Sequence, residues 1–140
     1  MSDAKVFVSY SNRDAAVAEK IAHALQGVQT PRKWKTFLDR KDIGAGEDIR
    51  KSLYANLQTS DAILVVAASP DAVSNSWVSY EIGMAEGLNK PIIVLTSNRY
   101  SPSDFREDLK SFPTITFDPE KPEGVAQEIA GRLTLLAAKK

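Results

Sequence analysis

The stretch "AILVVAAS" at residues 62–69 decides the fold, because it is apolar at both odd and even positions. Successive side chains of a β-strand point to opposite faces of the sheet, so such a run is expected where both faces are covered. "PIIVLTS" at residues 91–97 has the same character. Three further runs rich in Val, Ile, Thr or aromatic residues also predict strands: "KVFVSY" (5–10), "WKTFLD" (34–39) and "TITF" (114–117).

Helical periodicity fills the segments between these strands. Apolar side chains fall on one face in residues 12–27, from Ile49 to Leu57, in residues 75–88 and from Val125 to Leu136, and 102–111 carries a weaker helical pattern. Strict alternation of strand and helix predicts a parallel sheet with right-handed crossovers. The expected fold is therefore α/β and flavodoxin-like, a five-stranded parallel sheet in the order 2-1-3-4-5 with helices on both faces.

The composition is that of one ordinary globular domain. The chain has 140 residues, 43% of them hydrophobic and 26% charged, with a formal net charge of zero. It holds no repeat or linker, so residues 1–140 are expected to form a single domain, which the terminal "AAKK" could connect to further chain. The charge balance argues against general attraction to nucleic acid or anionic membrane. With neither a signal peptide nor a long apolar run, the sequence predicts a cytoplasmic protein.

The sequence lacks the residues that several kinds of functional site require. The chain has no cysteine and a single histidine, so no zinc site of the usual type and no other metal is expected. His23 falls beside Glu19 and Gln26 on the polar side of its helix, where a solvated histidine is expected rather than a member of a catalytic triad. "GAGEDI" (44–49) lacks the third glycine of a dinucleotide-binding fingerprint. The strand ends "SYS" and "AAS" lack the acids of a phospho-acceptor site.

The predicted topology nevertheless indicates where a ligand would bind. Open parallel sheets bind ligands beyond the carboxyl ends of the strands, where the strand order reverses. Here that crevice lies between the first and third strands. Ser9, Tyr10 and Ser11 follow the first strand, and Ser69 ends the third. The helix at 75–88 begins just after the third strand, so its first half is expected to overhang the crevice.

That helix carries an acidic residue among apolar ones. In "SWVSYEIGMAEGL", Trp77 and Glu81 are four residues apart and share a helical face whose other members are Met84, Ala85 and Leu88. Two interpretations stay open at this point. Either the helix is slightly rotated and Glu81 points to water, or a pocket holds its carboxylate for chemistry.

Three stretches, taken in order, resemble the motifs of Toll/interleukin receptor (TIR) domains. "KVFVSYSNRD" (5–14) resembles the first motif, and "FLDRKDIGAGEDI" (37–49) resembles the second with its BB loop. "SNSWVSYEIGMA" (74–85) resembles the third-helix segment, with a tryptophan and a glutamate four residues later. The resemblance covers residues 5–136 and implies the same flavodoxin-like fold.

The bacterial-type, NAD+-cleaving branch of this family implies an activity and a site. NAD+ would be the substrate and no cofactor would be needed, the products being nicotinamide and ADP-ribose or a cyclic ADP-ribose isomer. Glu81 matches the family's essential glutamate and would be the catalytic residue. The substrate-binding residues implied are Ser9, Tyr10, Trp77 and Asp39.

The resemblance also implies partners. The BB loop would be a lid or an interaction loop, made of Arg40, Lys41, Asp42, Ile43, Gly44, Ala45 and Gly46. Self-association through contacts that include residues 40–48 would activate the enzyme, with a fused or bound sensor module, in bacterial anti-phage defence or virulence. Direct binding of nucleic acid or membrane is not implied.

Two other functions stay open. A TIR domain can be a non-enzymatic scaffold that docks other proteins through its BB loop. A nucleoside deoxyribosyltransferase-like enzyme also attacks an N-glycosidic bond with a glutamate, on a related fold. Retention of both Trp77 and Glu81 favours the NAD+-cleaving enzyme.

Overall fold

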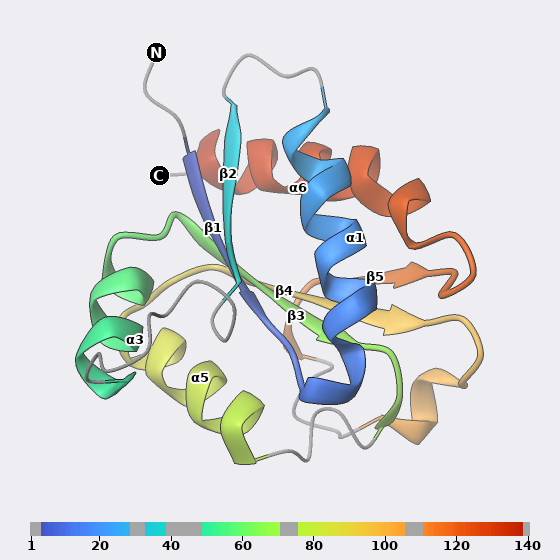
Figure 1. The fold of residues 1–140 in the computed structure, drawn as a ribbon, viewed down its shortest axis with the longest axis horizontal. Helices are drawn as coiled ribbons and strands as arrows, with labels where there is room; N and C mark the ends of the chain where they lie inside the picture. Colours follow the sequence, from blue (N-terminus) through green and yellow to red (C-terminus); the bar gives the residue numbers. More distant parts are fainter. Residues whose placement is uncertain (1–3, 29–32, 39–48, 71–75, 106–110, 139–140) are drawn as a thin grey trace.

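The computed structural model describes residues 4–28, 33–38, 49–70, 76–105 and 111–138 (Figure 1). The strands in these ranges form one parallel five-stranded sheet in the order β2-β1-β3-β4-β5. Their bounds are β1 (Ala4–Ser9), β2 (Trp34–Leu38), β3 (Ala62–Ala67), β4 (Ile92–Ser97) and β5 (Thr114–Phe117). The predicted α/β fold and its strand order are confirmed.

Helices cover both faces of the sheet (Figure 1). α1 (Ala15–Gln26) and α6 (Ala126–Ala138) pack on one face, and α3 (Ile49–Gln58) and α5 (Ser76–Gly87) pack on the other. Short 3-10 turns are η1 (Asn12–Asp14), η2 (Pro102–Asp104) and η4 (Pro122–Val125). Of the weak helix predicted at 102–111, residues 106–110 lie outside the described residues, and Pro102–Asp104 form the 3-10 turn η2. Within the described ranges, no helix combines the length and apolarity needed to span a membrane.

The two-sided burial expected of the third strand is present. All six residues of β3 are buried. Leu64 and Val66 join the apolar cluster under α1 and α6, while Ile63 and Val65 join the cluster under α3 and α5. Alternate residues of a strand therefore belong to different layers of the core. For β1, the position of a residue in this alternation determines which pair of helices its side chain faces.

α5 ends in a hydrogen-bonded cap. Asn89 has a φ of 57°, the left-handed conformation that asparagine adopts more readily than most residues. The N–H of Lys90 donates to the carbonyl of Ala85, and the N–H of Asn89 donates to that of Glu86, both at 3.0 Å. This pair of bonds is a Schellman motif, and it ends the helix at the "NKP" turn before β4.

At the other edge of the sheet, β2 is tied to α1. The backbone N–H of Thr36 donates to Oε1 of Gln26 at 3.2 Å. On its inner side β2 pairs with β1, with Ala4 opposite Trp34. A side chain of the covering helix therefore takes up one backbone donor of this edge strand.

Ser11, just before the first helical segment, does not cap α1. Residues Asn12–Asp14 form a 3-10 turn, and the α-helix begins only at Ala15. The Ser11 hydroxyl makes no cap bond and instead donates to Oδ2 of Asp14, at a long 3.4 Å. Asp14 is 6% exposed. Burial raises the pKa of its carboxyl, and bonds from the Ala68 N–H and Ser11, with the charge of Arg13, offset part of that rise.

Two leucines of α6 give a direct test of the core. Leu133 is 1% exposed, whereas Leu135 is 62% exposed. We expect Leu133→Ala to lower the free energy of unfolding by about 2–5 kcal/mol, because it opens a cavity between α6 and the sheet. Leu135→Ala should change it by less than about 0.5 kcal/mol. Urea unfolding of the two variants measures both, and equal losses would show that α6 does not pack as described.

Asp14 gives a pH-dependent prediction. A carboxyl whose pKa is higher in the folded than in the unfolded chain weakens the fold as pH rises from its ordinary value of 3.8 through the folded value. Asp14→Asn keeps the shape without the charge. Its stability relative to the wild type should therefore increase across that pH window and then level off.

Urea unfolding between about pH 4 and pH 7 measures this difference. Asp118→Asn, at an exposed position, reports the general effect of removing one negative charge. A difference for Asp14→Asn that is constant with pH, or that decreases as pH rises, would refute the prediction.

Candidate active site

The helix over the predicted crevice turns its acidic residue inward. Glu81 lies on α5 with 0% of its surface exposed. Its helical neighbours Val78, Ile82 and Ala85 are buried in the cluster under α3 and α5. The interpretation that Glu81 points to water is therefore wrong.

The buried stripe of α5 is rotated by about one residue from the predicted face. Met84 and Leu88, expected on that face, are only half-buried and pack at the margin of the cluster. Val78 and Ile82 take the central positions instead. Because the helix is apolar on much of its circumference, its sequence pattern defined the rotation poorly. Trp77 is in the first turn of α5, and its side chain lies outside what the structure describes.

Glu81 is bonded to the end of the first strand. The hydroxyl of Ser9 donates to Oε1 of Glu81 at 2.6 Å. Ser9 is the last residue of β1 and is paired in register with Val65 of β3. Its side chain is also 0% exposed. The bond therefore lies at the carboxyl ends of β1 and β3, where the strand order reverses and a ligand is expected.

Burial of the Glu81 carboxylate lowers the free energy of unfolding. Removing a carboxylate from water costs several kcal/mol even after the surrounding protein relaxes. A hydrogen bond to a charged group, such as the one that Ser9 donates, returns about 1.5–3 kcal/mol of this cost. An apolar side chain at position 81 would complete the stripe with Val78 and Ala85 at no such cost. Buried ionisable groups of this kind cluster at functional sites, so the structure favours a chemical role for Glu81.

Among the other residues predicted for the site, Tyr10 is the one whose side chain the structure describes, and it does not lie beside this pair. Tyr10 is buried in the cluster under α1 and α6, on the face of the sheet opposite to Glu81. Asp39 and the predicted lid, Arg40, Lys41, Asp42, Ile43, Gly44, Ala45 and Gly46, lie outside the described residues. The substrate-binding roles of Ser9, Tyr10, Trp77 and Asp39 stay predictions.

Asp14 is a buried acid at the same end of the sheet, and it was not among the residues predicted for the site. It follows β1, and its carboxylate accepts a bond from the backbone of Ala68, directly after β3. The sequence contains one sign that Asp14 could lie at the site. It is an acid three residues after Ser11, and it shortly follows a strand that ends at the crevice. That spacing is also typical of ordinary capping, so it did not predict burial.

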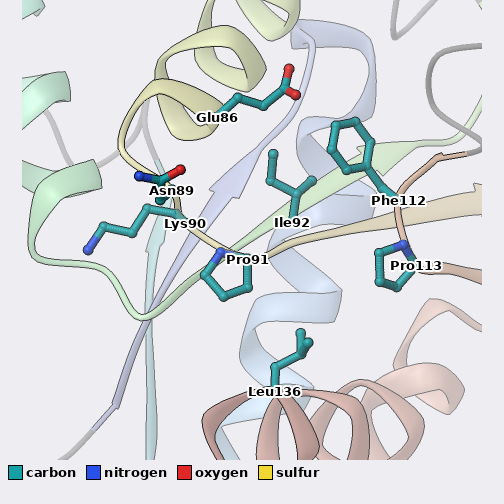
Figure 2. Close-up of a pocket in the computed structure, with 8 residues that line it drawn as sticks. All are labelled: Glu86, Asn89, Lys90, Pro91, Ile92, Phe112, Pro113 and Leu136. Atoms are coloured by element: carbon teal, nitrogen blue, oxygen red, sulfur yellow. The ribbon is translucent and has the colours of Figure 1, made fainter. Parts of the chain in front are cut away.

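Two surface hollows lie at the opposite end of the strands. One of about 390 Å³ is bordered by the turn before β4, the start of β5 and α6, as Figure 2 shows with Lys90, Pro91, Pro113 and Leu136. The other, of about 470 Å³, lies between the end of α1 and β2 and includes the exposed His23. Neither is lined by a residue predicted for the site, and both lie away from the carboxyl rim.

Solved structures share the fold. The TIR domains of the activated Roq1 resistosome, which directly recognises the pathogen effector XopQ, match with a TM-score of 0.57 and 20% identity over 94% of this chain and 74% of theirs. The CMP N-glycosidase BcmB of Clostridium botulinum matches with a TM-score of 0.55 and 16% identity, covering 90% of this chain and 97% of its own. A designed Rossmann 2x3 protein matches with a TM-score of 0.53 and 15% identity, over 92% of this chain and 90% of its own.

Sequence comparison is more specific. An uncharacterized protein of Sinorhizobium fredii (strain NBRC 101917 / NGR234), y4lF, is 31% identical over 85 residues, 61% of this chain. The chain spans about a quarter of the length of that curated relative (25%). The family profile described as "TIR domain" matches residues 6–130, which include most of β1, the Ser9–Glu81 pair and the start of α6. The chain therefore belongs to the TIR domain family.

Proposed function

We propose that this TIR domain is an NAD+ glycohydrolase. It would cleave the bond between nicotinamide and ribose, releasing nicotinamide and ADP-ribose or a cyclic ADP-ribose isomer. The observation that carries the proposal is the Glu81 carboxylate, fully buried at the carboxyl rim and bonded to Ser9. Such a group has little value for packing and much value for stabilising a positive charge.

One carboxylate is sufficient for this reaction. Glycosidases commonly use two acids, because the leaving oxygen must be protonated as the bond breaks. Nicotinamide in NAD+ is already a cationic pyridinium. When the bond from its nitrogen to ribose C1′ breaks, the electron pair stays on the nitrogen and nicotinamide leaves as a neutral molecule. Positive charge then develops on the ribose, and water attacks C1′ and gives up a proton.

Glu81 would stabilise that developing charge. Preorganised electrostatic groups of this kind contribute about 3–4 kcal/mol each in other enzymes, which corresponds to a rate effect of about 100-fold or more. An apolar wall strengthens the interaction, because it excludes water. Val78 and Ile82, which are buried on the same helix, would contribute to such a wall.

The burial of Glu81 also bears on activation. A carboxylate with 0% exposure cannot touch a ribose until neighbouring groups move. We therefore expect the isolated domain to turn over slowly. Self-association, with contacts that include residues 40–48, would supply the active arrangement. A fused or bound sensor would control it in the cytoplasm, in anti-phage defence or virulence.

Two alternatives differ in what they cleave. A scaffold that docks proteins through its BB loop would cleave nothing. A deoxyribosyltransferase-like enzyme would act on another N-glycosidic bond, and BcmB, a CMP N-glycosidase, has a similar fold. Deoxynucleosides and CMP therefore belong beside NAD+ in any assay.

Glu81→Gln tests the proposal. The variant keeps the size of the side chain and removes its charge, so we expect nicotinamide release by concentrated, assembled protein to fall by at least about 100-fold. Stability should be unchanged or higher, because a buried charge is gone. Chromatography of the released nicotinamide and thermal unfolding measure the two effects.

Glu86→Gln is the matched control. Glu86 is on the same helix and is exposed, so its replacement should leave turnover unchanged. Absence of nicotinamide release from assembled wild-type protein would favour the scaffold. Cleavage of CMP or a deoxynucleoside but not NAD+ would favour the other enzyme.

A further inference from the structure

We propose that Ser9 is a positioning residue, whose hydroxyl fixes the orientation of the Glu81 carboxylate and keeps it ionised. The inference rests on the proposed function for its catalytic meaning. It assigns Ser9 a task different from the contact with substrate that the family resemblance implies. The Ser9 hydroxyl and Oε1 of Glu81 are 2.6 Å apart, within the range of hydrogen bonds to ionised oxygens, about 2.5–2.7 Å.

The backbone determines this contact. Ser9 has the same strand parity as Phe7, so its side chain faces α5 rather than α1. Phe7 lies two residues before it, and Val65 is its partner on β3. From the helix, Val78 and Ile82 flank Glu81. Phe7, Val65, Val78 and Ile82 have apolar side chains, so none of these four described residues can donate a side-chain hydrogen bond to Glu81 as Ser9 does.

The single proton of the Ser9 hydroxyl distinguishes a positioning role for Ser9 from a role in binding substrate. A serine hydroxyl has one proton and can accept through its lone pairs. In this structure the proton goes to Glu81. Towards a ribose hydroxyl, Ser9 could therefore only accept. Loss of the Ser9 hydroxyl should therefore change the orientation and ionisation of the Glu81 carboxylate. The rate of the chemical step should fall as a consequence.

Ser9→Ala gives the decisive measurement. A hydrogen bond to the charged form of an acid favours ionisation, so removing it should make Glu81 harder to ionise. We expect the acid limb of the kcat profile to move up by about one to two pH units. At neutral pH kcat should fall by about 10- to 100-fold while KM changes by less than about threefold.

Two further variants separate the hydroxyl from the volume it fills. Ser9→Thr keeps the hydroxyl, on a β-branched residue suited to a strand, and should restore the wild-type pH profile. Ser9→Cys has a similar shape with a weak donor and should give an intermediate shift. Thermal unfolding identifies any variant that does not fold. The pH profiles of the variants that do fold then test the role of the Ser9 hydroxyl.

Ser97→Ala is the matched control. Ser97 is a buried serine that ends β4, as Ser9 ends β1. Its hydroxyl accepts a bond from the backbone N–H of Arg99 at 3.1 Å. Its replacement removes a buried hydroxyl at the same end of the sheet, and it should leave the pH profile unchanged.

A second readout does not depend on turnover. Carbon-13 NMR of the Glu81 carboxyl, assigned with Glu81→Gln, should show a titration shifted up by at least about one pH unit in Ser9→Ala and unshifted in Ser97→Ala. An unshifted titration in Ser9→Ala overturns the proposal. A raised KM with an unchanged pH profile overturns it too, because Ser9 would then be a substrate contact. Wild-type protein that releases no nicotinamide in any assembled state overturns only the proposed function, and the titration still decides whether Ser9 holds the carboxylate.

Discussion

Glu81 occupies a position on α5 where packing alone would favour leucine or methionine. It lies between apolar residues, has no contact with solvent and accepts a short hydrogen bond from the strand beneath. That contact requires α5 to lie over the carboxyl end of β1, which in turn requires the 2-1-3-4-5 strand order. The fold therefore brings together two residues that are 72 positions apart in sequence.

The same strand serves the core and the site. Val6 and Val8 pack under α1 and α6, while Phe7 packs under α5 with Ser9 beside it. A shift of one residue in β1 would exchange these faces, which would bury a serine in the wrong layer and turn a valine towards Glu81. Because side chains of β1 fill both layers, the register that the core requires also positions the hydroxyl.

Much of this fold could be predicted from the sequence. The third strand was predicted because its odd and even positions are both apolar, and the strand order was predicted from the alternation of strands and helices. The position of Glu81 at the crevice followed from topology. Topology also placed Ser9 at the crevice, but it did not predict the bond between Ser9 and Glu81. That bond requires the rotation of α5, which depends on how Val78 and Ile82 fit the sheet and which an apolar helix leaves open. The burial of Asp14 was missed for a similar reason, since its contact with Ala68 is tertiary while its sequence pattern is local.

The bond between Thr36 and Gln26 affects how the chain behaves among copies of itself. Unpaired backbone groups along an outer strand can recruit a strand from another molecule and start cross-molecular sheets. On β2 one of those groups is already engaged by the amide side chain of Gln26. An incoming strand would have to displace this amide before it could form its own ladder there. Gln26 therefore makes one backbone donor of β2 less accessible to a strand from another copy of the chain.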